Sequence, residues 1–83
     1  MKKALIIDDE QRTRELIAKM ITSFDLGIEA IPMGESVQSG IAAIAAIQPD
    51  LVFLDIQMPD GTGFDLLKAI PNKNFEVIFI TAH

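Results

Sequence analysis

The sequence lacks cysteine entirely, and its 83 residues include few basic side chains. Without cysteine, neither a disulfide scaffold nor a metal site built from thiolates can form, and the absence fits a reducing cytoplasm. Lys and Arg total 7 against 12 Asp and Glu, which gives a formal charge of −5. Because nucleic acid binding needs a basic surface, we predict that this segment does not contact DNA or RNA directly.

The sequence also lacks any long apolar run. A membrane-spanning helix needs about 20 apolar residues, and no stretch approaches that length. The apolar run after the basic start covers only residues 4–7 before Asp8, which is too short for a signal peptide. We therefore predict a cytoplasmic protein that does not associate with a membrane. The length allows one small domain, residues 1–83.

Three short apolar runs, and a fourth interrupted by Glu29, alternate with three segments of helical spacing. The runs lie at residues 4–7, 28–31, 51–54 and 77–80, and the helical segments at 11–24, 36–47 and 63–70. Continuous apolar runs are typical of strands buried on both faces, and their alternation with helices favours right-handed crossovers. The sequence therefore predicts an α/β fold, a doubly wound parallel sheet with helices on both faces.

Local signals mark the ends of the predicted helices. Gly27 can adopt the left-handed conformation that ends the first helix, and Ser36 is the expected N-cap of the second. Gly40 inside the second helix costs roughly 1 kcal/mol relative to alanine. The apolar side chains of the helices, including Leu16 and Met20, are expected to belong to the core.

Two of the predicted strands end in acidic residues. Asp8 and Asp9 follow the first strand, and Asp55 ends the third. The carboxyl ends of parallel strands share one edge, where such sheets bind ligands. Two charges about 4 Å apart repel by about 4 kcal/mol at an effective dielectric of 20, so the three carboxylates need a counter-charge or raised pKa values. Mg²⁺ suits them, because it prefers oxygen ligands and keeps waters that phosphate oxygens can replace.

Each acid has a simpler explanation when taken alone. Asp8 or Asp9 could cap the first helix, and Asp55 could form an Asx-turn ahead of Pro59. Their joint occurrence at two strand ends favours a metal site. Other phosphate chemistries lack their motifs: there is no glycine-rich loop closed by Lys and Ser or Thr, and no dinucleotide fingerprint at the first turn. A phosphatase of the haloacid dehalogenase type needs Asp-x-Asp, whereas this chain has Asp-Asp-Glu-Gln.

Three stretches together resemble the receiver domain of bacterial two-component response regulators. They are LIIDDE, PDLVFLDIQMPDGTGFDLL and VIFITA, in the family's order and over the whole chain. The stretches LDIQMPDGTGFDLL and ITAH are most similar to regulators with a LytTR-type DNA-binding domain. The resemblance implies a flavodoxin-like fold with strand order 2-1-3-4.

The resemblance also implies a role for each site residue. Asp55 matches the phospho-acceptor that takes a phosphoryl group from a sensor histidine kinase, and Thr81 matches the hydroxyl that turns toward this group, although threonine is also an ordinary strand residue. Asp8 and Asp9 match the pair that holds Mg²⁺, with Asp9 as direct ligand and Asp8 acting through water. Gln57 matches the position whose backbone carbonyl completes the metal shell. Such a domain is not a conventional enzyme, but it would catalyse its own phosphorylation and dephosphorylation and switch a downstream DNA-binding output.

The chain departs from the family after the fourth strand. The family's domain adds a helix, a strand and a last helix, so this chain would cover roughly its first two-thirds and lack the lysine that ends the fifth strand. Lys68 and Lys73 lie elsewhere in the pattern and are not expected to substitute, so phosphorylation should be impaired. The fourth strand, 77–80, would be an uncovered edge, which predicts an unstable chain that forms a homodimer or a strand-swapped assembly.

Two other functions stay open at this point. One is a receiver-like scaffold for protein contacts that is never phosphorylated, which the missing lysine favours. The other is a Mg²⁺-dependent phosphatase, which the missing Asp-x-Asp disfavours. His83, the single histidine, is expected to be neither a phosphoryl donor nor a ligand.

Overall fold

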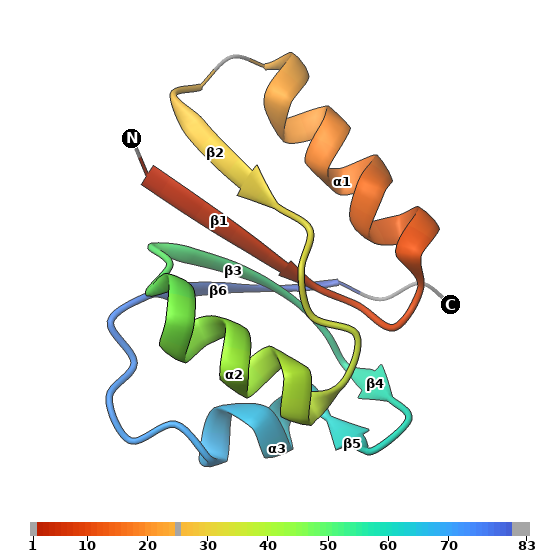
Figure 1. Ribbon diagram of the computed structural model, residues 1–83, viewed down its shortest axis with the longest axis vertical. Helices are drawn as coiled ribbons and strands as arrows, with labels where there is room; N and C mark the ends of the chain where they lie inside the picture. The colour runs from red at the N-terminus through yellow and green to blue at the C-terminus, as the bar shows by residue number, and fades with distance from the viewer. Residues whose placement is uncertain (1, 25, 81–83) are drawn as a thin grey trace.

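The computed structural model describes residues 2–24 and 26–80 (Figure 1). Along these ranges the strands are β1 (Lys2–Ile7), β2 (Ile28–Ile31), β3 (Leu51–Asp55), β4 (Gln57–Met58), β5 (Gly61–Thr62) and β6 (Glu76–Ile80). The helices are α1 (Gln11–Ser23), α2 (Val37–Ile47) and α3 (Gly63–Lys68). No helix within these ranges is long and apolar enough to cross a membrane.

The four longer strands form one parallel sheet in the order β2-β1-β3-β6. The prediction of a doubly wound, flavodoxin-like sheet with order 2-1-3-4 is confirmed, since β6 is the fourth of these strands along the chain. The third strand is followed by a feature that the sequence did not predict. There β4 and β5 pair as a small antiparallel hairpin, in which Met58 lies opposite Gly61.

Helices cover both faces of the sheet, as Figure 1 shows, with α1 on one side and α2 and α3 on the other. Alternate residues of β1 serve the two layers, because side chains of a strand point to opposite faces. Leu5 and Ile7 pack with α2 and α3, whereas Ala4 and Ile6 pack with α1. All four are completely buried, so the prediction that β1 is buried on both faces is confirmed.

The α1 side of the sheet is less covered than the sequence suggested. Ile21 is buried, but Leu16, Met20 and Phe24 are each more than half exposed, so their assignment to the core was wrong. Among the described residues α1 is the only helix on this face, and it packs against β1 and β2. An apolar groove of about 340 Å³ therefore remains beside it, lined by Ile17, Met20, Ile21, Phe24, Leu26, Ile28, Leu51, Phe53 and Ile80.

Strand β6 lies at the edge of the sheet and pairs with β3 alone among the described strands. Ile78 is 44% exposed and Phe79 39%, so the expectation that the run 77–80 is buried was wrong. The position of β6 agrees with the other prediction for this strand, that it forms an uncovered edge. Val77 of the same strand packs against the core on the α2 and α3 face. Phe79 contacts Phe64 of α3, with ring centroids 5.0 Å apart.

The N-terminal end of α2 follows the local signal, and Gly40 inside the helix has a packing role that the sequence did not indicate. Ser36 is the N-cap and forms a capping box with Ser39. A Cβ on Gly40 would lie 2.7 Å from Cδ1 of Leu66 and 3.2 Å from the side chain of Ile7. Gly40 thus allows α2, α3 and β1 to approach one another closely. Gly27 has φ +70°, as predicted for the turn after α1.

Candidate functional site

The acidic residues predicted at two strand ends do meet at one edge of the sheet. In the pairing of β1 with β3, Ile7 lies opposite Leu54, so Asp8 and Asp55 follow side by side. Asp8 is 1% exposed and Asp55 3% exposed, whereas Asp9 is exposed to solvent. Two nearly buried carboxylates at neighbouring strand ends are costly, because burial disfavours their charged forms.

Asp8 is held by its backbone and has an unused oxygen. Its N–H donates to the carbonyl of Gly34 at 3.0 Å, and the N–H of Glu10 donates to its Oδ1 at 2.8 Å. Arg14 donates from its guanidinium to the Asp8 carbonyl. Oδ2 is buried and has no hydrogen bond partner among the described residues. The N-cap of α1 is Glu10, without a side-chain capping bond, so the helix-cap explanation of these acids is not supported.

Asp55 has weaker local support. The N–H of Gln57 donates to its Oδ1 at 3.4 Å, a long bond that leaves the Asx-turn explanation with little energetic weight. Gln57 itself is exposed at the start of β4. Behind Asp55 lies Gly63, where a Cβ would sit 2.6 Å from the Asp55 carbonyl oxygen. The start of α3 can therefore press against the end of β3 only because residue 63 has no side chain.

The electrostatics of the cluster show uncompensated negative charge. Burial raises the pKa of Asp8, and the neighbouring acids Asp9 and Glu10 raise it further. Burial also raises the pKa of Asp55, followed by the charge of Asp8 and the nearby Asp9. The carboxylate oxygens of Asp8, Asp9 and Glu10 lie within 4.8 Å of one another, a group that does not include Asp55. The predicted site did not include Glu10, although Glu10 directly follows Asp8 and Asp9 in a run of three acids.

The loop after Asp55 is tied to the rest of the fold by Asp60, a residue that the sequence analysis did not single out. Asp60 lies in the turn between β4 and β5 and is exposed. However, its Oδ1 accepts from the N–H of Val37 at 2.7 Å and its Oδ2 from that of Gln38 at 3.1 Å. These bonds lower the pKa of Asp60. Nothing within a few residues of Asp60 indicated this contact, because its partners lie 22 and 23 positions earlier.

Two residues discussed in the sequence analysis lie beyond the part of the chain that the structure describes. Thr81, the expected hydroxyl, and His83 lie outside the described residues. The structure therefore brings Asp8, Asp9, Asp55 and Gln57 to one edge and leaves the roles of the remaining two as predictions.

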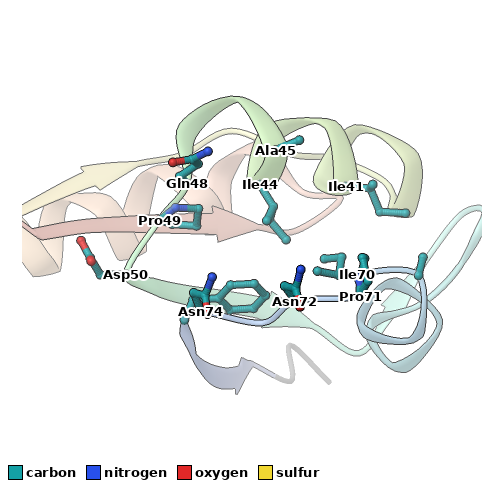
Figure 2. Close-up of a pocket in the computed structure, with 12 residues that line it drawn as sticks. Ile41, Ile44, Ala45, Gln48, Pro49, Asp50, Ile70, Pro71, Asn72 and Asn74 are labelled. Carbon is teal, nitrogen blue, oxygen red and sulfur yellow. The ribbon is translucent and has the colours of Figure 1, made fainter.

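A larger cleft lies at the opposite end of the sheet. It measures about 520 Å³ and is lined by Ile41, Ile44, Ala45, Gln48, Pro49, Asp50, Ala69, Ile70, Pro71, Asn72, Asn74 and Phe75. Figure 2 shows Ile44 pointing from α2 toward the segment of Ile70 and Pro71. Asp50, its only charged residue, accepts a hydrogen bond from the Lys3 N–H at 2.8 Å. The cleft borders the amino ends of β3 and β6, away from the acids, and offers no comparable chemistry.

Comparison with known proteins identifies the family of this domain. The family model described as the response regulator receiver domain matches residues 4–83. The chain belongs to this family. It is 40% identical over 84 residues to an uncharacterised response regulatory protein of Vibrio cholerae, and 34% identical over 83 residues to the transcriptional regulatory protein BtsR of Escherichia coli. These matches cover 100% and 99% of this receiver domain.

Solved receiver structures have the same fold. The response regulator TrrA of Thermotoga maritima, in complex with Mg²⁺ and beryllium fluoride, matches with a TM-score of 0.86 and 32% identity. That match covers 100% of this receiver domain and 71% of the TrrA chain. The chain spans only about a third of the length of these curated relatives, 35% of the Vibrio protein and 34% of BtsR.

The buried carboxyl of Asp8 predicts a dependence of stability on pH. Folding raises its pKa above the ordinary value of 3.8, so the stability that it contributes is full below that value and is lost as the pH rises through the folded pKa. We expect Asp8→Asn to stabilise the metal-free chain at pH 7, because asparagine fills the same space without a charge to bury. Urea unfolding from acid to neutral pH measures this gain.

Asp65 provides a control of opposite sign for the Asp8 experiment. Hydrogen bonds from Thr62 lower the pKa of Asp65, so its contribution is present at neutral pH and lost in acid. Asp65→Asn should therefore destabilise the receiver domain at pH 7 and have less effect in acid. A gain from Asp8→Asn that stays constant across the pH range would contradict the prediction.

Proposed function

We propose that Asp55 accepts a phosphoryl group from the phosphohistidine of a sensor histidine kinase. The observation that carries the proposal is the buried Asp55 carboxylate beside Asp8 at the carboxyl edge of the sheet, in a chain of the receiver family. An oxygen of Asp55 attacks the phosphorus, the bond from phosphorus to the histidine nitrogen breaks, and an aspartyl phosphate remains. Catalysis of such a transfer is mostly positioning and electrostatics, which a rigid strand end supplies.

The residues on this edge fit a Mg²⁺ ion. The buried Oδ2 of Asp8 has no partner among the described residues, and the neighbouring carboxylates raise one another's cost of ionisation. Asp9 and Asp55 would hold the ion directly, Asp8 through water, and Gln57 through its backbone carbonyl. When bound, the ion supplies positive charge that offsets the carboxylates and the transferred oxygens. Complexes of TrrA with Mg²⁺ and of MaeR with beryllium trifluoride support this assignment.

The relatives also bear on the protein to which this chain belongs. We infer that residues 1–83 are the first part of a receiver domain in a longer cytoplasmic regulator, because solved relatives and curated relatives both extend beyond the match. We assign the output to DNA binding of the LytTR type on the resemblance of LDIQMPDGTGFDLL. In that regulator Thr81 would turn toward the phosphoryl group on Asp55.

A Mg²⁺ titration followed by nuclear magnetic resonance tests the proposed site. We expect amide shifts confined to the carboxyl edge of the sheet, at Asp8, Asp9, Asp55 and Gln57. Ca²⁺ and Na⁺ at equal ionic strength separate ion binding from general screening of charge. Shifts centred on the cleft of Gln48 and Asp50, or none at all, would contradict the assignment. Incubation with acetyl phosphate and Mg²⁺, followed by intact mass, then tests phosphoryl transfer.

The exposed edge strand motivates a second proposal, self-association of the 83-residue chain. Ile78 and Phe79 of β6 are exposed, and an exposed apolar edge is a template for another chain. We expect sedimentation velocity to show dimers or swapped assemblies at micromolar concentration. Ile78→Lys, which places a charge on this edge, should shift the population to monomer. A monomeric wild-type sample with a cooperative melting transition would contradict this proposal.

A further inference from the structure

The segment from Gly34 to the first turn of α2 is hydrogen-bonded to both sides of the acidic edge. On one side, the carbonyl of Gly34, just before α2, accepts the N–H of Asp8 at 3.0 Å. On the other side, the two carboxylate oxygens of Asp60 accept the N–H groups of Val37 and Gln38 at 2.7 and 3.1 Å. Asp60 belongs to the turn of the β4–β5 hairpin, the segment that follows Asp55. The start of α2 therefore bridges the ends of β1 and β3.

The hairpin after Asp55 has few other anchors. At its far end the N–H of Gly63 donates to the carbonyl of Ile56 at 2.8 Å. At its near end the bond from the Gln57 N–H to Asp55 is 3.4 Å long. Between these points only Met58 is buried, whereas Gln57 and the turn around Asp60 are exposed. The two bonds of Asp60 are thus the main attachment of the hairpin turn to the body of the domain.

Ordinary helix capping does not account for Asp60. Ser36 already caps α2, with its Oγ accepting from the N–H of Ser39 at 3.1 Å, and Ser39 Oγ accepts from the N–H of Ser36 at 3.0 Å. The carboxylate of Asp60 takes the two remaining donors of the first turn from a position more than 20 residues away. Contact at Gly61 gives independent support, because a Cβ there would lie 3.2 Å from Cγ2 of Val37.

We propose that Asp60 is a positioning residue, which clamps the β4–β5 hairpin to α2 and so fixes Gln57 and Asp55 relative to Asp8. This inference rests on the proposed Mg²⁺ site, since its consequence is a metal shell whose parts keep their places. Removing a residue that orients the metal ligands without binding the metal typically weakens metal affinity by about 10- to 100-fold.

A pair of matched variants tests the clamp. Asp60→Ala and Ser36→Ala each remove acceptors from the same end of α2, so both should lower the melting temperature. We expect Asp60→Ala to raise the Kd for Mg²⁺ by about 10-fold or more, and Ser36→Ala to leave it within about two-fold, since Ser36 makes no bond to the hairpin. Asp60→Asn, which keeps one acceptor oxygen, should recover part of the affinity. Calorimetric titration of each full 83-residue chain with MgCl₂ measures all four proteins.

Each outcome supports or overturns the clamp. Equal Mg²⁺ affinity in the wild type and Asp60→Ala would overturn the clamp and leave the proposed function intact. Equal weakening in Asp60→Ala and Ser36→Ala would also overturn it, because Asp60 would then act only through helix stability. Absence of Mg²⁺ binding in the wild type would instead refute the proposed function together with the clamp. If Asp60→Ala does not fold, the comparison of Asp60→Asn with Ser36→Ala decides in the same way.

Discussion

Replacing Asp55 by asparagine is expected to abolish phosphorylation of the chain by acetyl phosphate. The substitution removes the proposed nucleophile and keeps its shape, so packing around the end of β3 should survive. We expect a loss of at least about 100-fold, a conservative figure beside the roughly 10⁶-fold cost of removing the nucleophile of a serine protease. Intact mass after incubation with Mg²⁺ and acetyl phosphate measures the phosphorylated fraction against time.

Asp50→Asn is the matched control, because Asp50 lies just before the other end of β3, where its carboxylate accepts a hydrogen bond from the Lys3 N–H. It should be phosphorylated as the wild type is. Binding of beryllium trifluoride, followed by ¹⁹F resonance, gives a second readout that needs no transfer step. Phosphorylation of Asp55→Asn at the wild-type rate would refute the assignment of the acceptor. Unchanged partner binding without any phosphorylation of the wild type would favour the scaffold hypothesis.

The lysine that the family places at the end of its fifth strand should affect the rate of phosphorylation by acetyl phosphate. The family resemblance implies that a lysine beyond residue 83 contacts the phosphoryl group, so we expect the wild-type chain to be phosphorylated more slowly than a version extended through that strand. Both proteins should still depend on Asp55. A comparison of the two rates separates the contribution of the later segment from that of the acidic edge.

Gly63→Val is expected to be the most destabilising single change near the site. A Cβ at this position would lie 2.6 Å from the carbonyl oxygen of Asp55 and 3.0 Å from Cγ of Leu54, and a backbone atom cannot move aside as a flexible side chain can. Forced overpacking of this kind costs about 3 kcal/mol. That is a large share of the roughly 5 to 15 kcal/mol that holds a typical domain folded. Urea unfolding followed by circular dichroism measures the loss.

Gly27→Val serves as the control for Gly63→Val. Gly27 has φ +70°, but nothing lies within 4 Å of the position that its Cβ would occupy. The substitution should therefore cost only the backbone strain, about 1 to 2 kcal/mol. Equal losses at the two positions would show that the contact with Asp55 is not what requires glycine at residue 63.

Much of the fold could be predicted because its signals are local. A run such as residues 4–7 requires cover on both faces wherever it lies, and the spacing of apolar residues in α1 and α2 fixes their helical period. Ser36 caps α2 through a bond to a residue three positions away. The meeting of Asp8 and Asp55 could also be expected, because parallel strands end at a common edge.

Other features depended on contacts between residues far apart in the chain. The pattern of α1 predicted a buried stripe, but the tertiary structure covers only part of it, because no other described helix shares that face. The apolar run of β6 likewise predicted a buried strand, but the edge position of β6 leaves Ile78 and Phe79 exposed.

By itself, the sequence determined the alternation of strands and helices, the N-cap of α2, and the acids at the ends of β1 and β3. Only the tertiary structure decided that Asp60 binds the start of α2, and that Gly40 and Gly63 are sites of close approach. The physical reason is range. Periodicity and capping act within a few residues, so they can be predicted from the sequence. Asp60 bonds to a helix 22 positions earlier, and a glycine is needed only where another element packs against it. Both effects depend on neighbours that folding brings together.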